Sequence, residues 1–341
     1  MVRRRGSGAG RIEPAPEHGG AHPLRAARLP PHRLRGARVT IIGLGAVGAI
    51  AAERLAVRGI GQMTLVDRDV VEGRNPERPS LYEEADIGDP KASAAHTRLQ
   101  ALNPTIRVEA RVKDLHAGNA TQLVKNSGIV LDGTDNLATR YVLNEACIRR
   151  GIPFLYGAAM GAVGMVSPLR PPWTPCFRCL LPPPTDLDRV EPCATDGARV
   201  APRVGELLAS LALRFLDRGT IIRGLYLLRD GEPDAERLEV SPRPGCPACQ
   251  RGTREFLIAR EGPTVVQLCG GDLVSVDPGR EEKIDLAHLA ARLAPLAPVR
   301  RTPYLLSLEV PPYGLSIFPD GRAIIRGVTS PEVARAVYDR Y

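Results

Sequence analysis

From Arg38 to Gly48 the sequence reads RVTIIGLGAVG. Its first part, RVTII, has the β-branched composition of a buried strand, and the glycines that follow it predict a tight turn. The next residues, AIAAERLAVRG, space their apolar side chains as a helix does, and Gly59 and Gly61 predict the end of that helix. A strand, a glycine turn and a helix in this order favour an α/β fold.

Strands and helices continue to alternate downstream. Strands are predicted within 62–67, 107–112, 128–136 and 152–159, and helices within 91–103, 139–150 and 203–219. Residues 168–200 are rich in proline and predict a long irregular loop, and residues 221–240 resemble two further strands. The alternation predicts a doubly wound, mainly parallel sheet of the Rossmann type.

The pattern divides the chain into three predicted parts. Residues 1–36 form a basic, Pro- and Gly-rich tail that we expect to be disordered, and residues 37–252 form the α/β domain. Residues 253–341 carry short strands, a helix within 285–297 and a last helix that Ser330 and Pro331 are suited to begin. We therefore expect a small α+β domain at the C-terminal end.

Composition excludes several classes of function. The formal charge is +8, but residues 1–38 contain nine arginines and only two acidic residues, Glu13 and Glu17. The rest is close to neutral, and aromatic residues make up 4%, which together argue against nucleic-acid binding. No run reaches the roughly 20 apolar residues of a membrane helix, and no apolar stretch of a secretory signal follows the start. Seven cysteines, four of them in C-x-x-C pairs, suit the reducing cytoplasm.

The glycine turn itself fits G-x-G-x-x-G, with Gly43, Gly45 and Gly48 at the three glycine positions. Such glycines let the backbone approach a phosphate at the positive end of a helix. Asp67 ends the next strand, about twenty residues further on, where a carboxylate can accept hydrogen bonds from ribose hydroxyls. These two features fit an ATP-binding enzyme and an NAD-dependent oxidoreductase equally well.

Charged residues after Asp67 distinguish an ATP-binding enzyme from an NAD-dependent oxidoreductase. Asn75 and Arg78 lie in the loop DRDVVEGRNPER, and Lys91 opens the following helix. Attack on the α-phosphate of ATP requires such cations because negative charge builds on the phosphoryl oxygens, whereas hydride transfer does not. Asp135, in DGTDN after a strand, is placed to hold a Mg²⁺ that bridges the phosphates.

The cysteines form a second motif. Cys176 and Cys179 make one C-x-x-C pair, and Cys246 and Cys249 make another. Four thiolates with no open position are typical of structural Zn²⁺, and a redox dithiol is the alternative for either pair. Of the other three cysteines, Cys147 and Cys269 lie in apolar patterns that predict core positions.

Residues 38–252 resemble the ThiF/MoeB family, relatives of the ubiquitin-activating enzymes. The resemblance lies in GLGAVG, in D-x-D-x-V followed by N-x-x-R, in the Pro-Lys before a helix, in DGTDN with Arg140 and Asn144, and in PCATDG. The C-terminal strings VVQLCGGDLVSV and FPDGRAIIRG resemble an extension of the longer bacterial ThiF-like proteins. The likeness implies that Asp67 and Asn75 bind ribose, Arg78 and Lys91 bind the phosphates, and Asp135 binds Mg²⁺.

The resemblance also implies a reaction. The enzyme would use ATP to adenylate the C-terminal Gly-Gly carboxylate of a ubiquitin-like sulfur carrier protein, for thiamine-thiazole, molybdopterin or related sulfur transfer. Sulfur would then come from a persulfide donor, or through a covalent link to Cys193, and the enzyme would be a homodimer. The sequence departs from the family in lacking an Arg-Gln segment before the first strand and in having Pro79.

Three alternatives remain at this point. The same chemistry could act on a peptide or a tRNA-bound carboxylate, although tRNA-modifying relatives usually lack the cysteine pairs. A non-catalytic partner of a ubiquitin-like protein would have no need of Arg78, Lys91 and Asp135. An NAD-linked oxidoreductase would bind NAD in preference to ATP.

Overall fold

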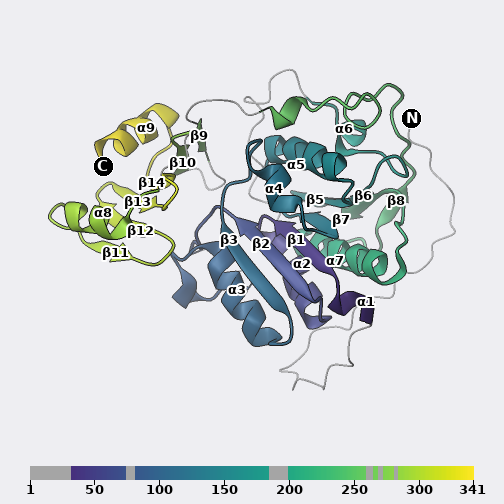
Figure 1. Ribbon diagram of the computed structural model, residues 1–341, viewed down its shortest axis with the longest axis horizontal. Helices are drawn as coiled ribbons and strands as arrows, with labels where there is room; N and C mark the ends of the chain where they lie inside the picture. Colours follow the sequence, from purple (N-terminus) through teal and green to yellow (C-terminus); the bar gives the residue numbers. More distant parts are fainter. Residues whose placement is uncertain (1–31, 74–80, 184–198, 259–263, 268–271, 280–282) are drawn as a thin grey trace.

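The computed structural model describes residues 32–73, 81–183, 199–258, 264–267, 272–279 and 283–341. Within these ranges the chain forms an eight-stranded sheet and a six-stranded sheet, which lie side by side (Figure 1). The predictions for Asn75, Arg78, Cys193 and Cys269 fall outside the described residues.

The larger sheet has the strand order β3-β2-β1-β4-β5-β6-β7-β8. Its strands are β1 (Arg38–Ile42), β2 (Gln62–Asp67), β3 (Arg107–Val112), β4 (Ile129–Asp132), β5 (Phe154–Met160), β6 (Val163–Leu169), β7 (Leu225–Arg229) and β8 (Glu236–Leu238). Neighbours from β3 to β5 pair in parallel, and β6, β7 and β8 add antiparallel strands. The predicted mainly parallel α/β sheet is thus confirmed.

Helices cover both faces of this sheet, because neighbouring residues of each buried strand point to opposite sides. In β4, Leu131 belongs to the core beneath α2, α3 and α7, whereas Val130 belongs to the core beneath α4 and α5. The helices of this part are α1 (His32–Arg35), α2 (Ala46–Val57), α3 (Lys91–Leu102), α4 (Ala120–Val124), α5 (Leu137–Arg150), α6 (Phe177–Leu180) and α7 (Ala201–Arg218), with 3₁₀ turns η1 (Glu84–Asp86) and η2 (Glu255–Leu257).

Helix α7 packs closely on α2, the helix that follows the glycine turn. A Cβ on Gly205 would lie 2.6 Å from the carbonyl oxygen of Val47, so only glycine allows the two backbones to approach this far. An ion pair of 2.6 Å between Arg54 and Glu206 joins the same helices at the surface. Helix α7 ends at Gly219, which is in the left-handed conformation usual for a glycine C-cap.

The six-stranded sheet is antiparallel throughout, in the order β11-β12-β13-β14-β10-β9. Its elements are β9 (Thr264–Gln267), β10 (Leu273–Asp277), α8 (Leu286–Leu293), β11 (Val299–Arg301), β12 (Leu306–Val310), β13 (Tyr313–Ile317), β14 (Ala323–Arg326) and α9 (Pro331–Arg340). It has its own apolar core, to which α8 and α9 contribute. Ser330 caps α9 as predicted, since its side chain accepts a hydrogen bond from the Val333 amide.

The structure differs from the sequence-based expectation in short elements. Strand β6, helix α4 and strand β11 were not predicted, and the loop expected over 168–200 contains the one-turn helix α6. Helix α1 was not predicted either, and it lies within the tail 1–36 that was expected to be disordered. Strand β6 was not predicted because it contains Gly164 and Pro168, which are unusual in a strand interior. The predicted domain boundaries at residues 36 and 252 stay predictions.

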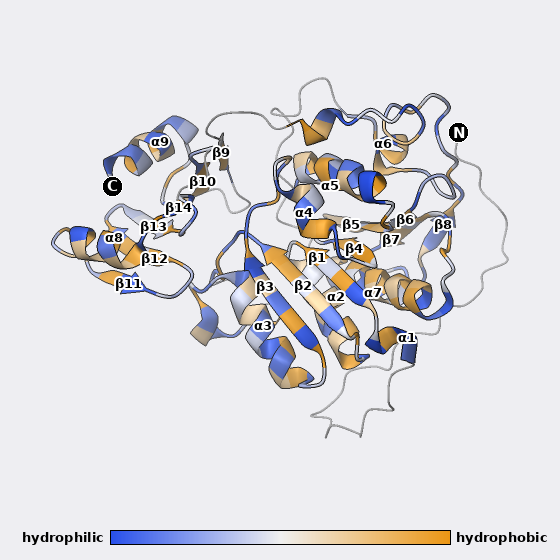
Figure 2. Cartoon of the chain, in the orientation of Figure 1, coloured by the Kyte–Doolittle hydropathy of each residue, from blue (hydrophilic) through white to orange (hydrophobic). Residues whose placement is uncertain are grey.

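One part of the larger sheet carries polar residues. Strand β3 alternates between hydrophilic and hydrophobic residues along its length (Figure 2), so Arg107, Glu109 and Arg111 share one face. The apolar Val108 packs in the core on the opposite face. Across the described ranges, no helix combines the length and hydropathy that crossing a bilayer requires.

Candidate nucleotide and metal sites

The glycine turn between β1 and α2 is built on close backbone contacts. Gly43 has φ +83°, a conformation that favours glycine, and its N–H donates to the Val66 carbonyl at 2.9 Å. A Cβ on Gly48 would lie 1.9 Å from the Gly43 carbonyl oxygen. Gly45 differs, because a Cβ there would meet no protein atom within 4 Å. Two of the three motif glycines are therefore required by the protein itself, and the third leaves open space in front of helix α2.

A fourth glycine completes this turn. Gly133 follows β4, its N–H donates to the Ile42 carbonyl at 2.8 Å, and a Cβ on it would lie 2.4 Å from the Gly43 carbonyl oxygen. Gly133 lies within the string DGTDN, but no role was predicted for it. Its role depends on the pairing of β1 with β4, which no local pattern reveals.

Asp67 lies at the carboxyl end of β2 and faces the turn. Its Oδ2 accepts a hydrogen bond from the Leu44 N–H at 2.6 Å, and its Oδ1 accepts one from the Asp69 N–H at 2.7 Å. Burial and the charge of Asp69 raise the pKa of Asp67 to about 6, against the opposing effect of Lys91. This carboxylate thus holds the first residue after Gly43 in place.

Lys91 is buried at the start of α3 and reaches back toward β2. Its Nζ lies 3.3 Å from Oδ2 of Asp69, and its N–H donates to the Asp69 carbonyl at 2.9 Å. Burial lowers the pKa of Lys91, but the charges of Asp69 and Asp67 outweigh burial and raise the pKa above its ordinary value. The amine therefore stays protonated at neutral pH, as a cation that binds phosphate must.

Asp135 follows a rigid turn after β4. The buried Asp132 pairs with Arg140 at 3.1 Å and accepts a hydrogen bond from the Thr134 N–H at 2.8 Å, while Arg140 also donates to the Thr134 carbonyl. Asn136 then caps α5 by accepting from the Thr139 N–H at 2.9 Å. Residues on both sides of Asp135 are thus fixed, and Asp135 itself is exposed.

Arg68 follows β2 directly and lies within electrostatic range of Asp135. Burial lowers the pKa of this guanidinium, but Asp114, Asp69 and Asp135 together raise it above its ordinary value. Arg68 lies 3.3 Å from Asp114. Arg68 was not predicted as a site residue, although its place between Asp67 and Asp69 is a signal that the sequence offers.

The described site residues gather where the strand order reverses. Strand β1 lies between β2 and β4, and the glycine turn, Asp67 and Asp135 follow the carboxyl ends of these three strands. Open α/β sheets bind ligands at such a switch point. The structure brings Gly43, Gly45, Gly48, Asp67 and Lys91 to this edge.

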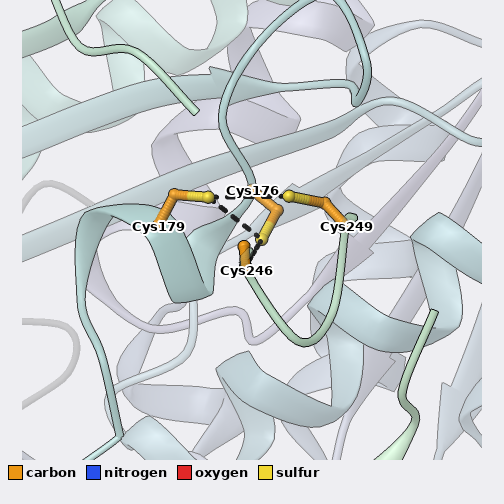
Figure 3. Close-up of side chains that lie close together, drawn as sticks. All are labelled: Cys176, Cys179, Cys246 and Cys249. Carbon is orange, nitrogen blue, oxygen red and sulfur yellow. Dashed lines mark hydrogen bonds between the residues drawn. The ribbon is translucent and has the colours of Figure 1, made fainter. Parts of the chain in front are cut away.

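The four cysteines predicted as metal ligands come together at a second site (Figure 3). Cys176 and Cys179 belong to the start of α6, and Cys246 and Cys249 to a turn after β8. Their Sγ atoms lie 3.8 Å apart for Cys176 and Cys179, 3.7 Å for Cys176 and Cys246, and 3.5 Å for Cys179 and Cys249. Zn–S bonds of about 2.3 Å in a tetrahedron place sulfurs about 3.8 Å apart, so the cluster has dimensions suited to Zn²⁺.

This cluster is anchored to α5. The Phe177 N–H donates to Oδ1 of the buried Asn144 at 2.8 Å, and Arg178 pairs with the buried Glu145 at 3.2 Å. Glu145 also accepts from the Phe256 N–H at 2.9 Å. Helix α5 therefore joins the cysteine cluster to the Asp132–Arg140 pair beside the glycine turn.

The fold and the glycine turn define a nucleotide-binding α/β protein of the Rossmann type. Residues 28–249 match the model of the ThiF family, and the chain belongs to that family. It is 32% identical over 321 residues to the sulfur carrier protein ThiS adenylyltransferase of Bacillus subtilis, covering 91% of this chain and 94% of that protein. It is also 38% identical over 226 residues to the sulfur carrier protein adenylyltransferase of Thermus thermophilus, covering 64% of this chain and 83% of that protein.

A solved structure of E. coli MccB with succinimide has the same fold. It matches with a TM-score of 0.56 and 22% identity, covering 64% of this chain and 67% of its own. The predicted family and fold class are thus confirmed, including the likeness of the C-terminal extension to longer bacterial members.

The two kinds of glycine in the turn predict opposite phenotypes. Gly48→Ala forces a Cβ against the Gly43 backbone, and we expect it to lower the free energy of unfolding by about 1–3 kcal/mol. Gly45→Ala meets no protein atom, so its stability should change by less than about 1 kcal/mol while ATP binding weakens. Chemical denaturation and calorimetric ATP titration measure both effects. Equal loss of stability in the two variants would contradict this assignment.

The raised pKa of Asp67 predicts that a lower pH weakens ATP binding but stabilises the fold. Below about pH 6 the protonated carboxyl accepts hydrogen bonds less well, so the Kd for ATP should rise as the pH falls through that value. The folded state binds the proton more tightly than the unfolded state, so the same protonation should stabilise the fold between about pH 6 and 4. Asp67→Asn serves as the control, because it keeps the titration of ATP itself and loses both effects. A pH profile identical in the two proteins would refute the role of Asp67.

The cysteine cluster predicts a bound metal. We expect about one zinc per chain by elemental analysis, and Cys176→Ser should lose it and unfold at a lower temperature because binding energy contributes to folding. Cys147→Ala is the matched control, since Cys147 is buried outside the cluster and its loss should leave the zinc content unchanged. Retention of stoichiometric zinc by Cys176→Ser would exclude this site.

Proposed function

We propose that this protein uses ATP to adenylate the C-terminal glycine carboxylate of a ubiquitin-like sulfur carrier protein. One observation carries the proposal: at the switch point of the sheet, an open glycine turn stands beside the Asp67 carboxylate and the buried Lys91 cation. The names of the similar proteins from B. subtilis and T. thermophilus support it.

The chain's own groups would bind and orient ATP. The N–H groups at the start of α2, which has no side-chain cap, would hold phosphate oxygens in the space in front of Gly45. Asp67, with Asn75, would bind the ribose hydroxyls. Lys91, with Arg78, would bind the phosphates, and Asp69 would keep the Lys91 amine charged and aimed at the site.

Neutralisation of negative charge on the phosphates would be the contribution of a bound Mg²⁺. Asp135 would hold it, since its carboxylate is exposed after β4 and hard oxygen ligands are those that Mg²⁺ prefers. The rigid turn on both sides of Asp135 would fix the position of that oxygen.

The reaction needs positioning more than covalent catalysis. A carrier carboxylate oxygen attacks the α-phosphorus, a new O–P bond forms, and the bond to the bridging oxygen of pyrophosphate breaks. The products are a carrier acyl-adenylate and pyrophosphate, and no protein nucleophile takes part. Cations around the phosphates stabilise the charge that builds on the leaving group.

Later steps follow the same proposal. Sulfur would reach the acyl-adenylate from a persulfide donor, or through a covalent bond between Cys193 and the carrier. Zn²⁺ would be structural, because four cysteine ligands leave no open position. The enzyme would act as a cytoplasmic homodimer that serves thiamine-thiazole, molybdopterin or related sulfur transfer.

ATP–pyrophosphate exchange tests the function directly. We expect exchange only when a small protein ending in Gly-Gly is present, and loss of at least about a hundredfold in Asp135→Ala because the metal carboxylate is removed. Asp217→Ala, which removes a carboxylate at the far end of α7, should keep full exchange.

The outcomes separate the alternatives. A carrier that lacks its last glycine should give no exchange. Exchange with a peptide or an aminoacylated tRNA, but with no Gly-Gly carrier, would replace the proposed substrate. Bound carrier without exchange would establish a non-catalytic partner, and preference for NAD over ATP would establish an oxidoreductase.

A further inference from the structure

The six-stranded sheet contacts the larger sheet at the edge where its parallel strands end, which also carries the glycine turn. A small apolar cluster forms there, in which Phe318 and Ile324 pack near Val70 and Val112. Val70 lies three residues after Asp67, and Val112 ends β3 beside β2. The contact is thus made at the carboxyl ends of β2, the strand that ends in Asp67, and of its neighbour β3.

Arg300 of β11 adds a polar contact to the turn that precedes Lys91. Its Nη2 lies 2.8 Å from Oδ1 of Asp89, and its Nη1 donates to the Ile87 carbonyl at 3.4 Å. A Cβ on Gly88 would lie 3.3 Å from the same guanidinium, so Arg300 sits directly against this turn.

The turn that Arg300 holds is paired with the segment after Asp67. The Val71 N–H donates to the Asp89 carbonyl at 2.8 Å, and the Gly88 N–H donates to the Val71 carbonyl at 2.9 Å. Lys91 follows two residues after Asp89 and donates its N–H to the Asp69 carbonyl. Backbone hydrogen bonds therefore connect the turn that Arg300 contacts with the segment from Asp69 to Val71 and with Lys91.

A second contact reaches Asp67 from β3. The buried Arg322 donates to the Val112 carbonyl at 3.4 Å, and Asp320 pairs with Lys113 at 3.2 Å. The Lys113 N–H in turn donates to the Asp67 carbonyl at 3.1 Å. Residues 300–322 thus hold both the loop before Lys91 and the strand end beside Asp67.

We propose that the C-terminal sheet is a positioning element of the ATP site, and that Arg300 is a positioning residue that acts through Asp89 on Lys91. The inference rests on the proposed function, since it assigns Lys91 to the phosphates. Arg300 touches neither substrate nor reacting atoms. It fixes the turn 86–90, so that the Lys91 amine and the Asp69 carboxylate meet ATP already in place.

The test compares ATP and carrier kinetics in the full-length protein. Arg300→Ala should raise the Kd and KM for ATP by about twofold to fivefold, the range expected for loss of one partly exposed ion pair. The KM for the carrier and kcat should change by less than about twofold. Arg300→Lys should recover part of the ATP affinity.

Two further variants make the test specific. Asp89→Asn should weaken ATP binding to a similar extent, and the double variant should be no weaker than either single variant, because both remove one contact. Arg326→Ala is the matched control: Arg326 pairs with Glu309 inside the C-terminal sheet and should leave ATP binding unchanged. Amide exchange at Gly88, Asp89 and Lys91 should accelerate in Arg300→Ala and not in Arg326→Ala.

Failure of the positioning role is distinguishable from failure of the proposed function. A lower melting temperature in Arg300→Ala with an unchanged Kd for ATP would overturn the positioning role and leave Arg300 a structural contact. Because calorimetric ATP binding needs no carrier, the Kd ratio still decides the matter if the wild-type protein shows no exchange. A wild-type protein that binds no ATP would overturn both proposals.

Discussion

Close backbone contact among Gly43, Gly48 and Gly133 is the constraint on which the candidate nucleotide site depends. This site lies at the carboxyl ends of β1, β2 and β4, which we call the nucleotide edge of the sheet. Any Cβ at Gly48 or Gly133 would overlap the Gly43 carbonyl oxygen, so the turn after β1 forms only when all three side chains are absent. This contact draws the start of α2 against the end of β4. It thereby brings Asp67 and Asp135, which lie at the ends of the two strands on either side of β1, to one edge of the sheet.

The buried charges around the turn are arranged in pairs, and this arrangement is costly to break. Asp132 with Arg140 and Glu145 with Arg178 lie within the core, where an unpaired charge would be strongly destabilising. Both acids belong to or face α5, so the helix links the nucleotide edge to the cysteine cluster. Loss of metal would therefore loosen the anchor of α5 as well as the cluster itself.

Much of this fold could be predicted from the sequence because its signals are local. The strand composition of RVTII, the spacing of the glycines and the Lys91 and Ser330 helix starts need no tertiary information, and the structure has each of them. The C-x-x-C pairs were also readable, and the four thiols meet as their spacing predicts.

What the sequence could not provide are contacts between distant segments. Gly133 contacts Gly43, although ninety residues separate them in the sequence. The Asp132–Arg140 pair lies near the glycine turn only because β4 pairs with β1. Strand β6 was missed because its glycine and proline suppress the strand signal, and hydrogen bonds to β5 and β7 override that preference. Arg300 and Asp89 lie in sequence segments that give no hint of each other. The site therefore combines a glycine turn that its own sequence specifies with supporting contacts that exist only in the folded chain. The contacts of the C-terminal sheet belong to the second kind.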